Sequence, residues 1–255
     1  MSLRHNPLYR RARLVASSHR TQRADTFLAF TLAAIAGALN AGGFLFFGHY
    51  TSHMTGYMSQ IADQIVLENF MFALQGVAAV VLFVAGATTS AFIINWAKHN
   101  RPKQRFSLPL GLQGVLLMAF AASDGIGLPD TPARMFGLAL LCFVMGLQNA
   151  TITKISGAVI RTTHVTGVVT DIGIELGRGL YGASHANTSA RINKPKLRIL
   201  SGIVAMFLLG GITGALGYSL IGNWFSLPMA GVLLILALLP NLHRSSRLST
   251  ENQRG

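Results

Sequence analysis

Long apolar stretches separated by short polar connectors set the hydrophobic pattern of this chain. Lys, Arg, Asp and Glu are absent from residues 26–62, 69–97, 106–123, 135–153 and 199–242. A helix of about 20 apolar residues, rising 1.5 Å per residue, crosses a hydrocarbon core of about 30 Å. The pattern therefore predicts an all-α polytopic membrane protein.

About six transmembrane helices are expected from these stretches, with the ranges 26–47, 70–96, 107–123, 134–152, 199–221 and 224–242. Residues 199–242 require a turn, because a continuous helix of this length would extend roughly 66 Å, about twice the hydrocarbon core. Gly222 and Asn223 form a dipeptide that favours a tight turn there. The stretch 26–47 is expected to be a retained helix, since the apolar region of a signal peptide has only about 7–15 residues.

The charged residues sort by connector and predict the topology. Connectors 1–25, 97–106, 153–198 and 243–255 hold nearly all Lys and Arg, whereas 48–69, 124–133 and 222–223 hold none. Because Lys and Arg are enriched in cytoplasmic loops, both termini are expected in the cytoplasm. The net charge of +13 is then a topology signal that favours anionic lipid as a partner, and nucleic acid is not expected.

The two halves of the sequence resemble each other in four places that follow in the same order. The matched segments are 37–41 with 146–150, 51–61 with 162–172, 83–88 with 208–213, and 107–109 with 226–228. Each half holds three spans, and because three is odd, the second half enters the membrane from the opposite side. Such inverted repeats are typical of secondary transporters, whose sites lie near the midplane between the repeats.

This interpretation divides the chain into two repeats and two tails. The expected parts are a basic cytoplasmic N-terminal tail (1–25), a first three-span repeat (26–123), a second three-span repeat (134–242) with a cytoplasmic loop (153–198), and a cytoplasmic C-terminal tail (243–255). Within the second repeat, Gly210-x-x-x-Gly214 is expected to allow close helix packing.

Two His-x-Thr-Gly segments, at His53 and His164, and the Gly-Leu-Gln-Asn-Ala sequence at 146–150 resemble the YoaK family of bacterial membrane proteins, a domain-of-unknown-function family. The resemblance covers roughly residues 26–241. It implies a bacterial inner-membrane protein of about six spans and brings no substrate or activity with it. Tyr57 departs from the family pattern, in which many members have Asn after His-x-Thr-Gly.

The two His-x-Thr-Gly segments are too short to span a membrane and are expected to be re-entrant or interfacial helices, one at each face. A Thr-Gly pair at a helix start supplies a cap and permits close backbone approach. His164, Asp171 and Glu175 share one helical face, at i, i+7 and i+11. Carboxylates at membrane depth must pair or titrate, and a neighbouring histidine can relay protons.

The candidate substrate or proton-pathway residues are polar and glycine positions in or near these matched segments, expected to face one another across a central cavity. They are Asn40, His53, Thr55, Gly56, Gln60, Asn149, His164, Thr166, Gly167, Asp171 and Glu175. Simpler interpretations stay open: a wet cytoplasmic helix on which Glu175 meets Arg178 at i+3, and asparagines that link helices.

The leading hypothesis is a small-solute or proton-coupled transporter of unknown substrate, and the alternative is a non-transporting membrane scaffold or assembly factor that works through its basic loops. An enzyme is not expected, because the sequence has no Gly-x-Ser-x-Gly, no phosphate loop and no Cys or His pair with metal spacing. No cofactor or metal is expected, and the single Cys142 excludes a disulfide framework. A homo-oligomer stays open.

Overall fold

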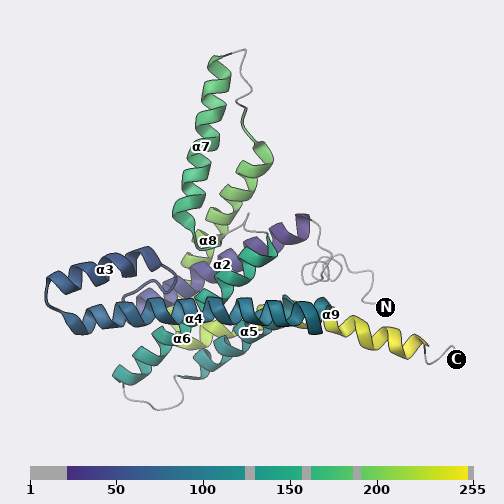
Figure 1. Cartoon of the computed structure of the whole chain (residues 1–255), viewed down its shortest axis with the longest axis horizontal. Coiled ribbons are helices and arrows are strands. Elements are labelled where there is room, and N and C mark those ends of the chain that lie inside the picture. The colour runs from purple at the N-terminus through teal and green to yellow at the C-terminus, as the bar shows by residue number, and fades with distance from the viewer. Residues whose placement is uncertain (1–21, 124–129, 157–161, 186–190, 252–255) are drawn as a thin grey trace.

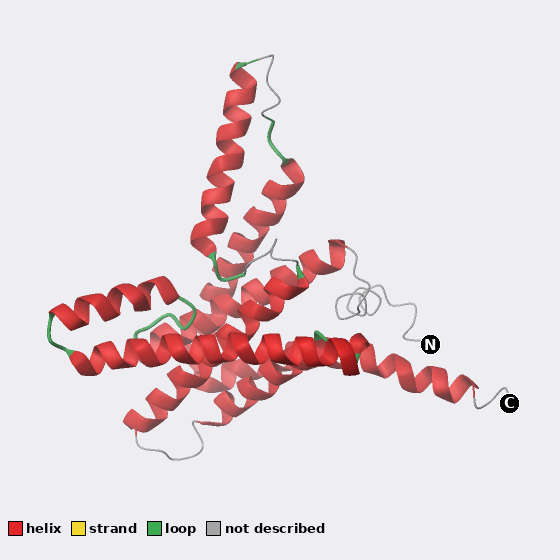
Figure 2. Cartoon of the chain, viewed as in Figure 1, coloured by secondary structure: helices red, strands yellow, loops and turns green. Residues whose placement is uncertain are grey.

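The computed structural model describes residues 22–123, 130–156, 162–185 and 191–251, and these are almost entirely helical (Figure 2). The helices are α2 (Gln22–Phe47), α3 (Met54–Val66), α4 (Phe70–Asn100), α5 (Ser107–Ala122), α6 (Asp130–Ile155), α7 (Val165–Ser184), α8 (Lys194–Ile221) and α9 (Ser226–Glu251). Two short 3₁₀ helices, η2 (Pro102–Gln104) and η4 (Gly222–Phe225), join α4 to α5 and α8 to α9. The expected all-α class is confirmed for the described residues.

Four stretches of the described chain are long and apolar enough to cross a membrane: Asp25–Phe47, Phe70–Asn100, Arg134–Ile155 and Lys194–Leu238. The last of these contains two helices, because the backbone turns at Gly222, where φ is 60°. The predicted turn is therefore confirmed, and the shorter α5 is apolar as well. These helices are compatible with a multi-pass membrane protein.

Helix ends differ from the expected ranges mainly in the connector 153–198, which holds more helix than the apolar pattern predicts. α7 has 20 residues, and α8 begins at Lys194 rather than near 199. The side chain of Asn193 caps α8 by accepting a hydrogen bond from the Lys196 amide at 3.0 Å, and Pro195 lies in the first turn. A capping Asn followed by an early Pro starts a helix regardless of hydropathy.

The predominantly apolar helices pack in three pairs, in which α2 lies along α8, α4 along α6, and α5 along α9 (Figure 1). The buried core draws on α2, α5, α6, α8 and α9, and includes Leu32, Leu117, Leu141, Ile203 and Leu233. By contrast, α4 exposes a long series of large apolar side chains, from Phe70 to Trp96. Exposed apolar surface of this extent suits a lipid environment.

The pair α2 and α8 is held at very short range by glycines. A Cβ placed on Gly37 would lie 2.0 Å from the carbonyl oxygen of Phe207, and one on Gly210 would lie 2.0 Å from that of Ala34. Gly214 approaches Ala38 in the same way, since a Cβ on Gly214 would lie 2.5 Å from the Ala38 Cα. The expectation of close packing at Gly210-x-x-x-Gly214 is confirmed.

The pair α4 and α6 makes the same kind of contact. A Cβ on Gly146 would lie 1.9 Å from the carbonyl oxygen of Phe83, and one on Gly86 would lie 2.0 Å from that of Phe143. No side chain larger than hydrogen fits at these positions without moving one helix backbone away from the other.

The helices of the two His-x-Thr-Gly motifs, α3 and α7, lie on different pairs and point in different directions (Figure 1). α3 packs on α4, whereas α7 packs on α8 and projects with the start of α8 away from the rest of the molecule. The expectation that the His-x-Thr-Gly segments face each other across a central cavity is therefore wrong. Each segment folds back on the helix that follows it, because the connectors 67–69 and 185–193 are short.

Candidate functional site

Asn40 fixes the turn that precedes α3. Its Nδ2 donates to the Ser52 hydroxyl at 2.7 Å, and its Oδ1 accepts from the Ser52 amide at 3.0 Å. The Thr51 hydroxyl donates to the same Oδ1 at 3.4 Å. Because the Asn40 side chain is 5% exposed, these bonds satisfy an amide that would otherwise be buried without partners.

Asn149 has the matching position before α7. Its Oδ1 accepts a hydrogen bond from the Thr163 hydroxyl, and its Nδ2 donates to the Met145 carbonyl at 2.8 Å. Both asparagines therefore tie a turn to the preceding helix of the same half. The simpler expectation is that these asparagines link helices. Their hydrogen bonds instead reach the turns before α3 and α7 and, for Asn149, a carbonyl of its own helix.

His53 and His164 are the N-cap residues of α3 and α7, and neither side chain caps its helix with a hydrogen bond. A Cβ on Gly56 would lie 2.6 Å from Nδ1 of His53, and one on Gly167 would lie 2.5 Å from Nδ1 of His164. The glycine of each motif thus makes room for the imidazole ring. Thr55 and Thr166 are exposed and lie inside the helix, so the expected threonine cap is wrong.

A hollow of about 150 Å³ opens beside the first motif. The turn after α2 contributes Gly48, His49 and Tyr50 to its wall. α3 contributes His53, Gly56, Tyr57 and Gln60. Three predicted candidates, His53, Gly56 and Gln60, therefore meet in one place.

Tyr57 is the most buried residue of this wall, at 4% exposure. Its hydroxyl lies 3.9 Å from Sγ of Cys142 on α6. Burial raises the pKa of the Tyr57 phenol well above its usual value, with the neighbouring Cys142 adding to the shift. The side chain is therefore a neutral ring whose position is set by α6.

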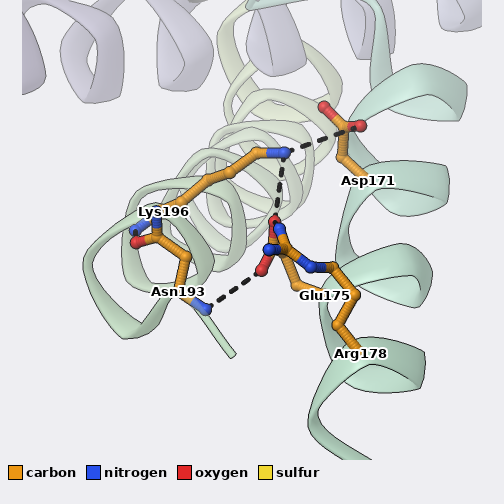
Figure 3. A network of polar contacts seen from close by, with 5 residues as sticks. All are labelled: Asp171, Glu175, Arg178, Asn193 and Lys196. Carbon is orange, nitrogen blue, oxygen red and sulfur yellow. Dashed lines mark hydrogen bonds and ion pairs between the residues drawn. The ribbon is translucent and has the colours of Figure 1, made fainter. Parts of the chain in front are cut away.

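Asp171 and Glu175 belong to a network of charges between α7 and the start of α8 (Figure 3). Nζ of Lys196 lies 3.3 Å from Oε1 of Glu175 and 3.9 Å from Oδ1 of Asp171. Nη1 of Arg178 lies 3.3 Å from the same Glu175 oxygen. The expected contact of Glu175 with Arg178 at i+3 is confirmed, whereas a wet cytoplasmic position for this helix stays a prediction. Lys196 is the partner that the sequence pattern did not reveal.

Glu175 is the central member of this network, with its side chain 1% exposed. Its Oε2 accepts a hydrogen bond from the Asn193 amide at 3.0 Å. This bond lowers the pKa of the Glu175 carboxyl below its usual value, and Lys196 and Arg178 add to the effect against the opposing cost of burial. The carboxylate stays charged and fastens α7 to α8.

The first half has glutamine in place of these acids. Gln60 lines the hollow, and Gln64 is half-buried. The exchange of Gln64 for Glu175 separates the two motifs chemically: one side is neutral, and the other holds an ion-pair network. Among the residues that the structure describes, no three His, Cys, Asp or Glu side chains come close enough to hold a metal ion.

Comparison with known proteins places the chain by family alone. No curated protein and no solved structure matches it. The family described as a protein of unknown function (DUF1275) matches residues 28–239, which contain both motifs and most of each helix pair. The expectation of a domain-of-unknown-function family is confirmed, and the chain belongs to the DUF1275 family.

Proposed function

We propose that this chain is a small-solute transporter of the bacterial inner membrane, built from two inverted three-span repeats. α2, α4 and α5 form the first set of spans, and α6, α8 and α9 form the second. The observation that carries the proposal is the reciprocal pairing of α2 with α8 and of α4 with α6. Exchange of the two halves turns one pair into the other, as a two-fold relation between repeats requires.

The glycine contacts support this relation at the level of single residues. Gly37 and Gly146 hold matching places in the repeats, and each meets the carbonyl of a phenylalanine on its partner helix. Gly86 and Gly210 make corresponding contacts, each with a carbonyl on its partner helix, although the sequence match of 83–88 with 208–213 puts Gly86 opposite Gly211. These two reciprocal sets of backbone contacts favour an inverted repeat over chance similarity between apolar helices.

The motif segments support the relation as well. Residues 51–61 and 162–172 have the same succession of buried, half-buried and exposed positions. Asn40 and Asn149 hold the turns that precede these segments. The same pairing of motifs favours the finer assignment to the YoaK family.

Six crossings would put both ends of the chain on one side of the membrane. Figure 1 shows the start of α2 and the end of α9 on the side of the molecule that lies opposite α3. The excess of Lys and Arg in the connectors favours the cytoplasm for that side. We expect the basic residues of the α7–α8 arm, including Arg191, Lys194 and Arg198, to meet anionic lipid headgroups on that side.

A pathway through the protein needs polar groups between the two halves. Gln148 on α6 is fully buried, and its Nε2 donates to the Leu32 carbonyl on α2 at 2.8 Å. Gln113 on α5 is also fully buried, and its amide has no hydrogen-bond partner among the described residues. A buried amide without partners is unfavourable, and a passing solute or water satisfies it.

The scaffold alternative is favoured by one observation, the projection of the α7–α8 arm away from the helix pairs (Figure 1). A scaffold would bind its partner through this arm and its cations. Neutralising Arg191, Lys194 and Arg198 together would then abolish partner capture, while Gln148→Leu would leave it intact.

Uptake into proteoliposomes tests the transport proposal. The purified full-length chain is reconstituted, and entry of radiolabelled choline, amino acids and sugars is followed with and without an imposed pH gradient. We expect at least one solute to enter faster than into protein-free vesicles, and Gln148→Leu to abolish that entry. The exposed Ser59→Ala variant is the matched control and retains it. Failure of every solute in vesicles that hold folded protein would contradict transport.

A further inference from the structure

The hollow beside α3 has a wall made mostly of rings. Four of its lining side chains, His49, Tyr50, His53 and Tyr57, are aromatic, and Gln60 adds an amide. Its volume of about 150 Å³ equals that of a cavity known to accept a molecule the size of benzene. The space therefore suits one compact group rather than an extended ligand.

Neighbouring contacts hold these rings in place. Tyr50 stacks on Phe44 with centroids 5.0 Å apart, and His49 lies against Tyr57 with centroids 5.8 Å apart. The ring of His53 lies over Gly56, which has no Cβ to displace it. The ring contacts of Tyr50, His49 and Tyr57 restrict these three side chains, so less conformational entropy is lost when a ligand enters.

No Lys or Arg lines the hollow, so no fixed positive charge there repels a cation. No Lys or Arg occurs between residues 26 and 97, so none lies on the apolar parts of α2 and α4 that flank α3. The acidic residues of this region, Asp63 and Glu68, do not line the hollow. The hollow runs along the side of α3 from His53 to Gln60. The N-terminus of α3, where an anion would be favoured, forms only one part of the hollow.

From these observations we infer that the hollow is a binding site for a small organic cation, of the trimethylammonium class. Aromatic faces attract such cations through their quadrupole, and rings grouped around a compact space are the usual way of recognising quaternary ammonium groups. The Gln60 amide oxygen is placed to accept a hydrogen bond from a polar substituent.

The second half of the chain lacks this chemistry. The matched alignment puts Val168 in place of Tyr57 and Asp171 in place of Gln60. His164 keeps the position of His53 and the contact with its glycine. The rings are thus an addition to the first repeat and are not required by the fold that both repeats share.

The role of this site rests on the proposed function. If the chain is a transporter, a solute site on the face opposite the termini would be an entry point for transport. Binding is nevertheless measurable without transport. The two claims therefore fail separately.

Equilibrium dialysis of the detergent-solubilised full-length chain against radiolabelled choline tests the site. The matched probe is 3,3-dimethylbutanol, which has the shape of choline without its charge. We expect choline to bind and the neutral analogue to bind more weakly. Tyr50→Ala should weaken choline binding by roughly two- to five-fold, which corresponds to the loss of one cation–π contact. His53→Ala removes another ring of the wall and should also weaken binding.

His164→Ala is the control variant, because it removes the matched imidazole from the other repeat and should leave binding unchanged. Absence of choline binding, or equal binding of choline and its neutral analogue, would overturn the site. Equal losses in His53→Ala and His164→Ala would also overturn it. If choline binds but does not enter proteoliposomes, the binding site stands and choline transport fails. If another solute is taken up and choline does not bind, the transport proposal stands and the binding site fails.

Discussion

The ammonium of Lys196, in the first turn of α8, lies 3.3 Å from the buried carboxylate of Glu175 on α7. The same carboxylate accepts the Asn193 amide and meets Arg178, so one side chain joins two helices and the cap between them. The matched position in the first half is Gln64, which has no comparable charge partner on the described part of α4. The α7–α8 arm is therefore fastened by electrostatics, and the α3–α4 unit by packing.

Glu175→Gln should loosen the arm while the helix pairs stay intact. The substitution keeps the shape of the side chain but removes the charge that Lys196 and Arg178 share. Spin labels at Ser184 and Ser201, both exposed, would report a broader distance distribution across the arm. Gln64→Glu, the matched substitution on α3, is the control and should leave the distances across the arm unchanged. An unchanged distribution in Glu175→Gln would show that packing alone holds α7.

Low pH should loosen the arm in the same way. The pKa of the Glu175 carboxyl is lowered in the folded chain, chiefly by the Asn193 amide. A group with a lowered pKa contributes its stabilisation fully above its ordinary value, about 4.3, and loses it as the pH falls toward the lowered value. The same spin-label distances, measured between pH 7 and pH 3, should broaden only in the acidic range. In Glu175→Gln, the distances should not change with pH.

Gly37→Ala and Gly146→Ala should destabilise the protein to a similar degree. In both cases the new Cβ would lie about 2 Å from a carbonyl oxygen of the partner helix, which forces the helices apart. Overpacking of this kind costs roughly 1–3 kcal/mol or more. Unfolding of the detergent-solubilised chain by denaturant measures the effect. Gly177→Ala, where the new Cβ meets open space, should be neutral or stabilising, and a similar loss there would contradict the contact argument.

Gln113→Met should raise stability and reduce transport. The substitution removes a fully buried amide without partners and keeps most of the side-chain volume. Because an unsatisfied buried polar group costs about 1–3 kcal/mol, the free energy of unfolding should increase by a similar amount. A variant that is less stable than the parent would mean that ordered water already satisfies the amide. A variant that is more stable and transports normally would remove Gln113 from the pathway.

Most of the helix pattern could be predicted from hydropathy, because apolar residues over the length of a span leave few alternatives to a membrane helix. The turn at Gly222 was predictable for the same reason, since residues 199–242 are too long for one crossing. The extension of α7 to Ser184 was not, because Gly177, Gly179 and Gly182 resemble a loop. In the structure, Ile192 packs over Gly179 and supports that part of the helix.

The sequence pattern identified several candidate residues but not the residues that they contact in the fold. His53, Gly56 and Gln60 meet at one hollow. His49, Tyr50 and Tyr57 complete its wall, and these three are not among the candidate residues predicted from the sequence. The partner of Asp171 and Glu175, Lys196, lies more than 20 residues along the chain, in a connector expected to be a loop. Contacts between distant segments depend on the pairing of helices, which hydropathy does not determine.

The inverted orientation of the two halves is the claim on which the transport proposal depends, and site-directed labelling tests it most directly. In a Cys142→Ala background, single cysteines replace Ser59 on α3 and Thr170 on α7, which are matched and exposed. A maleimide that does not cross membranes should label Ser59→Cys in intact cells and Thr170→Cys only after the membrane is opened. Labelling of both positions from the same side would contradict the account.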